Sequence, residues 1–484
     1  MATVLFRCDA SPTIGAGHVM RCLAFAETLA RFGWKAIFAV NRDAKTTVPA
    51  LGASGHRLIE VTAACDPAIV ADEESSVVVI DHYGYDATYE SQLAGPERVT
   101  IVFDDLANRA HDCDILVDPT PGRTAADYAP YVPARCRMVL GPEFAIVRST
   151  WREHRALTRA RLSLGLPVER IVVSMGATDP INATSRVLDA IARSSFGGRI
   201  DVVLGAGAPY IQDVSKRRDE RTVVHVEPDD LGEIVSSADL VIGAPGSSSF
   251  ERAVLGLPTL MIPTADNQKF VAAAFSAREV AKVLPASILD DPSALAGEID
   301  ALTGDPGVRL EMSAAAAAIT DGRGSLRLLA AIAGSVSVRG RVIRLRLAEE
   351  ADELWLLDLQ RQPATRRYAR DPAVPDAQGH KIWFERVLND PDRLLAIVVV
   401  DDAAVGMVRL DRLEERTFEV SIAIDQTCHR RGLGGAALTL LRRLASGADL
   451  VATIREENAA SISMFATAGY EPCAEDRYLN RATS

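Results

Sequence analysis

Ten short aliphatic runs in the first 330 positions constrain the fold of this chain more than any other feature. They are near-continuous rather than alternating, as in parallel strands that are covered on both faces. Amphipathic stretches such as 19–32 and 183–193 fall between them. This strand–helix alternation predicts doubly wound α/β layers. The predicted strands are 4–6, 36–40, 77–80, 99–103, 115–117, 171–174, 200–204, 223–226, 240–242 and 259–262.

The length of the alternating region argues for two sheets instead of one. Single hydrophobic cores stop growing at about 250–300 residues, whereas this region runs to residue 330 of a 484-residue chain. The charged stretch WREHRALTRAR at 151–161 has no strand pattern and is expected to be a helix or linker. We predict two Rossmann-like domains, 1–155 and 156–335, that face a cleft and bind ligands at the carboxyl ends of their strands. A single large α/β domain is the alternative.

The pattern changes after the small-residue stretch AIAGSVSVRGR at 331–341. A strand is predicted at 342–347, two paired strands at 395–400 and 405–410, and a further strand at 418–424. The chain then passes through a glycine-rich turn into another helix. Paired strands mixed with helices predict a separate α+β domain at 341–484.

Charge and cysteine content argue against several kinds of partner. The chain has 53 Lys+Arg and 65 Asp+Glu, a net charge of −12, so it lacks the excess of cations that nucleic acids and anionic membranes attract. No run approaches the roughly 20 apolar residues of a membrane helix, and the N-terminus lacks the apolar core of a signal peptide. Seven scattered cysteines, at 8, 22, 65, 113, 136, 428 and 473, form no CxxC pair, which argues against a disulfide framework or a zinc site. We expect a cytoplasmic protein without nucleic-acid or membrane partners, and its oligomeric state is left open.

A glycine-rich loop joins the first predicted strand to the first helix. Gly15 and Gly17 let the backbone approach a ligand closely, and the amides of the helix start suit an anion. His18 stands at that helix start, where the helix dipole and burial favour a neutral imidazole. A neutral imidazole is available as a general base near neutral pH. The alternative is a histidine that only caps the helix.

A second cluster, GAPGSSSFER at 243–252, also follows a buried strand and opens a helix. Glycine and serine donors at a helix start suit a diphosphate, and Glu251 can accept two ribose hydroxyls. Asp266, Asn267 and Gln268 supply carboxylate and amide groups after the next predicted strand. The alternative is a serine-rich helix cap beside a solvated glutamate.

These motifs occur in an order that resembles one known family, the UDP-2,4-diacetamido-2,4,6-trideoxy-β-L-altropyranose hydrolases of pseudaminic-acid biosynthesis. The resemblance covers about residues 3–330, and that family is similar in fold to inverting glycosyltransferases of the two-Rossmann, glycosyltransferase-B type. The residues that carry it are Arg7, Asp9, Gly15, Gly17, His18, Arg21, Asp81, Tyr83, Ser174, Gly176, Asp179, Pro180, the run 246–251, the run 266–268, Asp321, Gly322 and Gly324.

The resemblance implies that water displaces UDP from the anomeric carbon with inversion and without a metal. By position, His18 would be the catalytic base, while Tyr83 and Asn267 would orient sugar or water. The positions that it implies for substrate binding are Asp9, Gly15, Gly17, Arg21, Gly176, Gly246, Ser247, Ser248, Ser249, Glu251, Asp266 and Gln268, of which Asp9 would contact the sugar and 246–249 with Glu251 would hold the UDP. Ala177 and Pro245 depart from the family pattern.

The C-terminal region resembles a second family, the acetyl-CoA-dependent GNAT N-acetyltransferases, over about residues 342–480. A strand leads into CHRRGLGGAAL at 428–438, and a polar helix start at Asn458 is followed by the pair Gly469 and Tyr470. Glycine amides and arginines at a helix start suit a pyrophosphate. The resemblance implies that Asn458 contacts the pantetheine arm of acetyl-CoA. It also implies a CoA pyrophosphate site at Arg430, Arg431, Gly432, Gly434 and Gly435.

Three features of this region depart from the GNAT pattern or leave roles open. His429 replaces the usual first residue of the glycine turn. Phe465 stands where a tyrosine often protonates the leaving thiolate, so Tyr470, Tyr478 or water is left as the general acid. Glu419 is a candidate base for the acceptor amine, and the alternative is an exposed strand glutamate.

The two resemblances together predict a bifunctional nucleotide-sugar enzyme that acetylates a UDP-4-amino-sugar and then hydrolyses the product from UDP. Fusion of consecutive steps raises the local concentration of the intermediate. One alternative is an inverting UDP-sugar glycosyltransferase with a CoA-binding accessory domain, although no amphipathic membrane helix is evident. The other is that either domain binds its ligand without catalysis.

Overall fold

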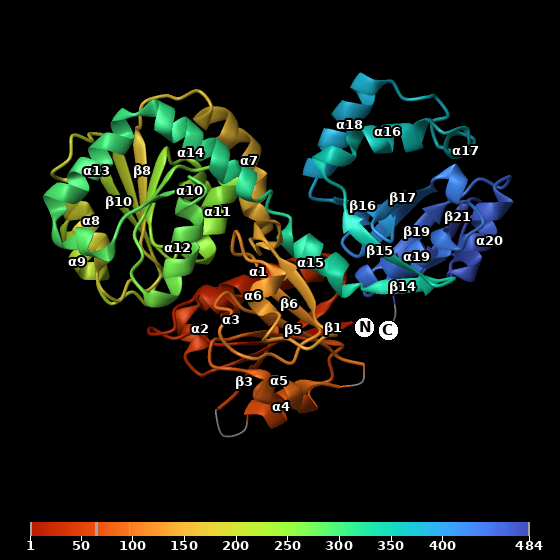
Figure 1. The fold of residues 1–484 in the computed structure, drawn as a ribbon, viewed down its shortest axis with the longest axis horizontal. Helices are drawn as coiled ribbons and strands as arrows, with labels where there is room; N and C mark the ends of the chain where they lie inside the picture. Colours follow the sequence, from red (N-terminus) through yellow and green to blue (C-terminus); the bar gives the residue numbers. More distant parts are fainter. Residues whose placement is uncertain (1, 63–65, 96, 483–484) are drawn as a thin grey trace. The chain divides into compact units, whose positions relative to one another are not determined.

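The computed structural model of the chain describes residues 2–62, 66–95 and 97–482 (Figure 1). Cys65 therefore lies outside the described residues. The chain divides into a larger compact unit, 4–27 with 36–325, and a smaller unit, 1–3 with 28–35 and 326–484. The predicted domain bounds at 155, 335 and 341 stay predictions.

The first sheet of the larger unit is parallel and has seven strands in the order β3-β2-β1-β4-β5-β6-β7. The strand order reverses between β1 and β4, which is the topological switch point where open α/β sheets bind ligands. The strands are β1 (Thr3–Cys8), β2 (Lys35–Val40), β3 (Arg57–Glu60), β4 (Val77–Asp81), β5 (Val99–Phe103), β6 (Ile115–Asp118) and β7 (Arg137–Leu140).

The second sheet of the larger unit is also parallel, in the order β10-β9-β8-β11-β12-β13, with its switch point between β8 and β11. Its strands are β8 (Arg170–Ser174), β9 (Arg199–Leu204), β10 (Thr222–Val226), β11 (Leu240–Gly243), β12 (Thr259–Met261) and β13 (Lys282–Val283). Successive residues of one strand enter two different cores: Ile171 and Val173 pack on one face, and Val172 packs on the other. Both faces are therefore covered by helices, which explains the continuous apolar runs in the sequence.

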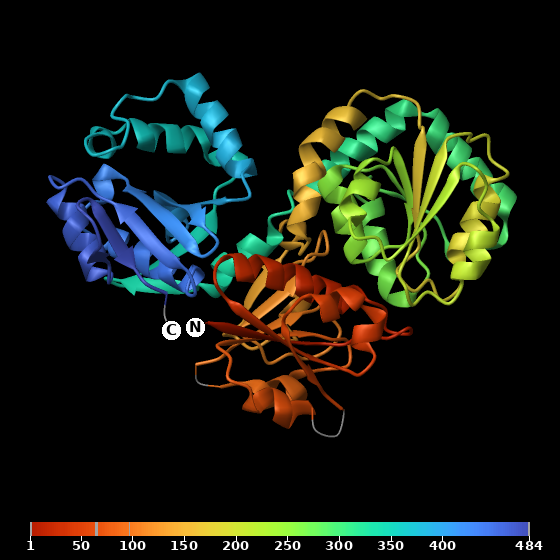
Figure 2. The ribbon, with the colours of Figure 1, turned by 180° about the vertical axis from the view of Figure 1, so that it is seen from behind.

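The helices of the larger unit lie on the faces of these sheets, as Figures 1 and 2 show. Those around the second sheet are α7 (Ser149–Leu162), α8 (Ala183–Ile191), α9 (Ile211–Lys216), α10 (Leu231–Ser236), α11 (Ser247–Leu255), α12 (Lys269–Ser276), α13 (Pro292–Gly304) and α14 (Pro306–Ile319). Those that belong to the first sheet are α1 (Gly17–Arg31), α2 (Ala44–Thr47), α3 (Pro49–Ala53), α4 (Asp66–Asp72), α5 (Ala87–Leu93) and α6 (Ala125–Tyr128).

The smaller unit contains an eight-stranded sheet in the order β14-β15-β16-β17-β18-β19-β21-β20. All of its pairs are antiparallel except β18 with β19. The strands are β14 (Ser335–Val338), β15 (Arg341–Leu347), β16 (Arg393–Val400), β17 (Ala403–Glu414), β18 (Thr417–Ile424), β19 (Asp449–Thr453), β20 (Glu471–Pro472) and β21 (Arg477–Asn480). The helices are α15 (Gly324–Ile332), α16 (Glu353–Arg361), α17 (Pro363–Arg366), α18 (Ala377–Asn389), α19 (Leu433–Leu444) and α20 (Ala459–Thr467).

The end of α1 and the residues after it belong to the smaller unit. The indole of Trp34 is buried and donates to the carbonyl of Leu444 at 2.9 Å. Phe32 stacks on Phe418 with ring centroids 5.3 Å apart. Gly33 and Gly447 approach so closely that a Cβ on Gly33 would lie 2.1 Å from the backbone of Gly447. Phe32 and Trp34 are thus part of the core of this unit.

The predicted fold class, two parallel α/β sheets followed by an α+β region, is confirmed. All ten strands expected in the first 330 residues form, and 151–161 lies inside the helix α7. The edge strands β3, β7 and β13 were not predicted, because their residues form no run of buried aliphatic side chains. In the described part of the chain, no helix has the length and apolar character needed to span a bilayer.

Candidate functional site

The first switch point brings His18 and Asp81 together. His18 is the second residue of α1, which directly follows the loop that leaves β1. Asp81 is the last residue of the neighbouring strand β4. The Nδ1 atom of His18 lies 2.5 Å from Oδ1 of Asp81. Arg21, one turn further along α1, donates to both oxygens of Asp81, at 2.8 Å and 2.6 Å. A carboxylate between two donors therefore fixes the imidazole ring.

The charge of Asp81 determines which nitrogen of His18 carries the proton. Burial alone would raise the pKa of Asp81, but Arg21 and His18 outweigh it and hold the pKa well below its usual range. An ionised carboxylate only accepts hydrogen bonds, so Nδ1 of His18 is the protonated nitrogen. The basic Nε2 lone pair is then left for a substrate, as in a base oriented by a carboxylate. The expectation that His18 only caps the helix does not account for this pairing.

Tyr83 and Asn267 lie beside this pair. The ring of Tyr83 packs edge-on against His18, with centroids 4.6 Å apart, and its hydroxyl donates to Oδ2 of Asp105 at 3.3 Å. Burial, followed by the charge of Asp105, raises the pKa of Tyr83, while a hydrogen bond with Asn267 opposes that rise. Tyr83 is therefore a neutral donor that connects the imidazole to Asn267. The structure brings together all three residues that were predicted to be catalytic.

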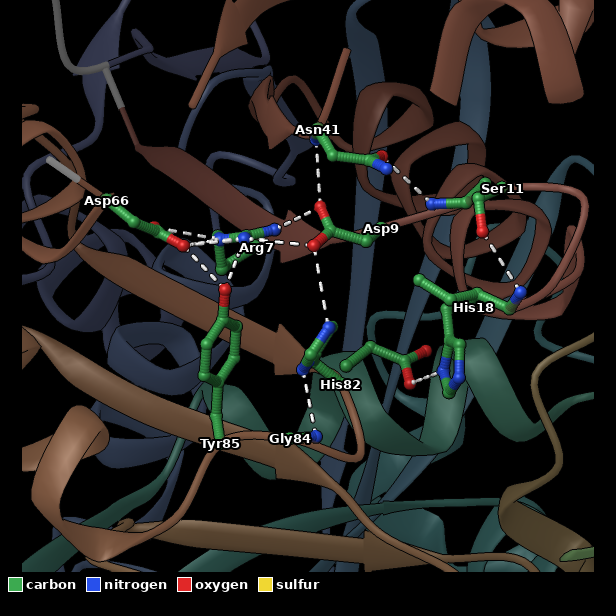
Figure 3. Close-up of polar contacts among 12 residues, drawn as sticks. Arg7, Asp9, Ser11, His18, Asn41, Asp66, His82, Gly84 and Tyr85 are labelled. Carbon is green, nitrogen blue, oxygen red and sulfur yellow. Dashed lines mark hydrogen bonds and ion pairs between the residues drawn. The ribbon is translucent and has the colours of Figure 1, made fainter. Parts of the chain in front are cut away.

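Asp9 lies in a polar network with Arg7, Asn41 and His82 (Figure 3). Its Oδ1 accepts from Arg7 at 2.5 Å and from the amide of Asn41 at 2.8 Å. Its Oδ2 lies 3.5 Å from Nε2 of His82, whose Nδ1 accepts from the amide of Gly84 at 2.9 Å. Both carboxylate oxygens are thus engaged within the protein. In this structure Asp9 positions the backbone after β1 and β2, and its predicted sugar contact stays a prediction.

The loop that carries Gly15 and Gly17 has room for a ligand. Gly15 has a positive φ of 87°, and no atom would lie within 4 Å of a Cβ placed on it. A Cβ on Gly17 would lie 3.6 Å from the hydroxyl of Ser247, at the start of α11. The two predicted glycine loops, which are about 230 positions apart in the sequence, therefore approach each other at Gly17 and Ser247.

The second loop, 244–249, follows β11 at the second switch point. Gly246 has a φ of 146° and its amide donates to the hydroxyl of Ser249 at 3.1 Å. The buried Arg252 supports this loop from behind, because it donates to Ala244, Ser248 and Ser249. The hydroxyl of Ser249 is buried and engaged, whereas Ser247 and Ser248 are half-buried. Of the three predicted serines, Ser247 lies nearest to the first loop.

Glu251 is half-buried on α11 rather than solvated. Burial raises the pKa of its carboxyl, and the nearby cations Arg148 and Arg252 oppose that rise. The same burial lowers the pKa of Arg252 to about 10, against the charge of Glu251. A carboxylate in this position can accept hydroxyl groups, and its predicted contact with the ribose stays a prediction.

The remaining predicted substrate residues differ in their surroundings. Gly176 follows β8, the strand next to β11, with a φ of 109° and open space around it. Gln268 closes a turn by accepting from the amide of Thr264 at 2.7 Å. The side chain of Asp266 is 93% exposed and pairs with Lys269 at 2.6 Å. Asp266 is therefore engaged at the surface in this structure, and its role in substrate binding stays a prediction.

In the smaller unit, the three glycines of the predicted pyrophosphate loop have different surroundings. Gly432 precedes α19 with a φ of 81°, which only glycine adopts easily. A Cβ on Gly434 would lie 2.3 Å from the sulfur of Met464. The absence of a side chain at Gly434 therefore allows α20 to pack closely against α19. Gly435 has open space in front of it. Arg430 and Arg431 are exposed at the same turn. The loop thus offers two cations and a helix start to an anion.

The strands β18 and β19 separate at Glu419. Their parallel ladder ends at the pair of Glu419 with Val451, although β18 continues to Ile424. Beyond this pair, the backbone groups of β18 and β19 that face each other form no ladder hydrogen bonds. The side chain of Glu419 is 14% exposed and accepts from Arg370 at 2.7 Å and from Thr453 at 2.9 Å. The alternative of an exposed strand glutamate is therefore wrong.

The second helix start of this region is at Asn458, which caps α20 by accepting from the amide of Ser461 at 3.1 Å. Phe465 is buried and packs against Tyr470, with ring centroids 4.8 Å apart. The hydroxyl of Tyr470 is also buried, and burial raises its pKa above the usual value. Since Tyr470 is enclosed in the core, Tyr478, on β21, or water is the better candidate for a general acid.

Three residues of the site were not predicted as functional from the sequence: Asp81, Asp105 and Arg252. Asp81 was noted only as part of a motif, although its place at the end of a buried strand was a signal. Asp105, two positions after the end of β5, accepts from Tyr83. Arg252 gave no signal, because a buried arginine inside a helix cannot be recognised from its sequence neighbours. Within the described ranges, no group of three or more His, Cys, Asp or Glu side chains is arranged to hold a metal ion.

Comparison with known proteins agrees with this division of the chain. Residues 342–471 match the acetyltransferase (GNAT) domain family. The chain is 23% identical over 262 residues to an uncharacterised protein of Methanocaldococcus jannaschii, covering 52% of this chain and 54% of that protein. It is also 23% identical over 214 residues to the UDP-2,4-diacetamido-2,4,6-trideoxy-beta-L-altropyranose hydrolase of Campylobacter jejuni, covering 44% of this chain and 73% of that protein.

The match thus spans about half the length of the first of these relatives. Among solved structures, MurG of Acinetobacter baumannii aligns with a TM-score of 0.48 and 15% identity, over 68% of this chain and 98% of that one. The chain therefore combines a region homologous to a nucleotide-sugar hydrolase with a GNAT domain. The predicted fusion of these two kinds of domain is confirmed.

Proposed function

We propose that the chain is a bifunctional enzyme of nonulosonic-acid, pseudaminic-type biosynthesis. Its GNAT domain would transfer an acetyl group from acetyl-CoA to the 4-amino group of a UDP-linked amino-sugar. Its α/β region would hydrolyse UDP-2,4-diacetamido-2,4,6-trideoxy-β-L-altropyranose to the free sugar and UDP with inversion. The hydrogen bond of 2.5 Å between His18 and Asp81, beside Tyr83, carries this proposal.

In the hydrolysis, Nε2 of His18 takes a proton from water while the water oxygen attacks the anomeric carbon. The bond between that carbon and the diphosphate oxygen breaks, and UDP leaves with the bonding electrons. Asp81 stabilises the imidazolium that forms. Tyr83 and Asn267 orient the water or the sugar. The amides of Ser247 and Ser248 at the start of α11 stabilise the charge that develops on the diphosphate, and Glu251 accepts the ribose hydroxyls.

In the acetyl transfer, Glu419 takes a proton from the acceptor ammonium. The neutral amine attacks the thioester carbonyl, the new C–N bond forms, and the C–S bond breaks. Acetyl-CoA would lie with its pyrophosphate at Arg430, Arg431 and Gly435, and with its pantetheine arm in the gap between β18 and β19, where free backbone groups are available. The nitrogen gives up its second proton to solvent, and water or Tyr478 donates a proton to the thiolate.

The variant His18→Ala tests the hydrolase. We expect UDP release from the diacetamido substrate to fall by about 10²- to 10⁴-fold, which is the usual contribution of a general base. The KM should change little, because His18 acts on water rather than on the nucleotide. A variant that releases UDP at the wild-type rate would exclude His18 as the base.

Hydrolysis in H₂¹⁸O distinguishes attack of water at carbon from attack at phosphorus. The same assay tests the alternative function of a glycosyltransferase. Attack at carbon places the label in the sugar, and attack at phosphorus places it in UDP. Anomeric analysis of the fresh product by NMR should show inversion. Label in UDP would contradict the mechanism. Release of UDP only after a sugar acceptor is added would instead support the alternative of a glycosyltransferase.

A further inference from the structure

One segment of the smaller unit extends across the gap between β18 and β19. We call residues 362–370 the acceptor loop. At its beginning, Gln362 donates to Asp425 at 2.7 Å and accepts from the amide of Gln426 at 2.9 Å, just beyond β18. Near its end, Arg455, just beyond β19, donates to the carbonyl of Ala369 at 3.0 Å. The loop is therefore attached to both sides of the gap.

The last residue of the acceptor loop covers Glu419. The guanidinium of Arg370 lies 2.7 Å from Oε1 of Glu419, at the point where the two strands separate. The Arg370 side chain is 78% exposed, whereas that of Glu419 is 14% exposed. Thr453 donates to the same oxygen at 2.9 Å and keeps the carboxylate in place. Arg370 is thus the more exposed partner of this pair, and it is the one that can leave while Thr453 holds the carboxylate in place.

The cations of the acceptor loop divide into two groups. Arg366 is tied to the segment that follows the loop, because it donates to the carbonyls of Asp371 and Ala373. Arg367 is exposed and lies over the ring of Tyr368, with its guanidinium carbon 5.1 Å from the ring centroid. Arg367 and Arg370 therefore offer two exposed guanidinium groups, which suit the oxygens of a diphosphate.

We propose that Arg370, with Arg367, selects acceptors that carry a diphosphate: it covers Glu419 in the free enzyme and moves onto the diphosphate when a nucleotide-linked amine binds. The acceptor ammonium then replaces the guanidinium at Glu419. An amine without a diphosphate must also displace Arg370 from Glu419, but it offers the displaced guanidinium no new anion to bind. This inference rests on the proposed acetyl transfer and adds the residues that would determine its acceptor specificity.

The test compares two acceptors in the full chain. The substitution His18→Ala is included throughout, so that the UDP-linked acceptor is not hydrolysed. Thioester cleavage of acetyl-CoA is measured with a UDP-linked 4-amino-sugar and with the same amino-sugar without UDP. For the further substitution Arg370→Ala, we expect KM for the UDP-linked acceptor to rise roughly tenfold or more, as for loss of a charge-assisted hydrogen bond. We expect KM for the free amino-sugar to stay the same or fall, and Arg370→Lys to restore part of the preference.

The matched control is Arg344→Ala, which removes an arginine from a surface pair of similar length, 2.6 Å, with Asp402. It should leave both KM values unchanged. Equal effects of Arg370→Ala on the two acceptors, or no effect on either, would overturn the role of Arg370 while leaving acetyl transfer intact. Absence of thioester cleavage with any amine by a folded, CoA-binding parent chain would instead overturn the proposed acetyl transfer itself, and this inference with it.

Discussion

At the residue scale, the carboxylate of Asp81 connects two side chains of α1 to the end of β4. It is fully buried and accepts from both His18 and Arg21. A buried charge is tolerated only when it is paired, and here the pairing has a chemical consequence. Because Arg21 keeps Asp81 ionised, Asp81 orients His18 and fixes its tautomer. Arg21 therefore acts on the base through Asp81.

Asp81→Asn tests this role while preserving the shape of the side chain. The amide can donate to Nδ1 of His18 and so favour the wrong tautomer, and we expect kcat for UDP release to fall by about 10²- to 10⁴-fold with little change in KM. Steady-state kinetics and thermal unfolding check the rate and the fold. Asp86→Asn, at the exposed cap of α5, should keep the wild-type rate. A folded Asp81→Asn variant with full activity would contradict the assignment.

At the element scale, the start of α8 depends on one carboxylate. Asp179 is 3% exposed and accepts from the amides of Ala183 and Thr184, each at 2.8 Å. It follows Gly176 by three positions, so the loop that leaves β8 ends at the residue whose side chain holds the start of α8. The cap therefore links the stability of α8 to the shape of a predicted substrate loop.

Asp179→Ala should lower the free energy of unfolding by about 1–2 kcal/mol, the usual effect of losing such a cap. We also expect a higher KM for the UDP-sugar, since the Gly176 loop loses its support. Chemical denaturation and steady-state kinetics measure the two effects. Asp291→Ala is the control, because Asp291 also accepts from two backbone amides at a helix start, that of α13. If both variants lose stability but neither changes KM, the cap has no part in substrate binding.

At the scale of the whole molecule, α1 is shared by the two compact units. Its beginning carries His18 in the larger unit, and its last turn and the residues after it pack in the smaller unit. Trp34 is 8% exposed there. A fragment 341–484 cut at the predicted domain boundary would lack Phe32 and Trp34 and would expose the surface that they cover, including Phe418.

Trp34→Ala should therefore destabilise the smaller unit by about 3 kcal/mol or more, the usual cost of truncating a buried aromatic side chain. Trp34→Phe keeps most of the packing but loses the bond to Leu444, so a smaller loss of about 1 kcal/mol is expected. Thermal unfolding of the full chain, recorded with and without CoA, measures both losses of stability. An unchanged transition in Trp34→Ala would show that these residues do not stabilise the unit.

The sequence by itself determined the α/β layers and the α+β region through its apolar runs, and the two glycine loops through their residue types. Both signals lie in residues that are neighbours in the sequence. Only the tertiary structure decided which distant groups meet. His18 pairs with Asp81 because β1 and β4 are neighbours at a switch point, and strand order leaves no trace in periodicity. The same reason explains why Gly434 serves helix packing, why Asp266 faces solvent, and why residues 28–35 belong to the smaller unit. Each depends on which surfaces come together after the elements have formed.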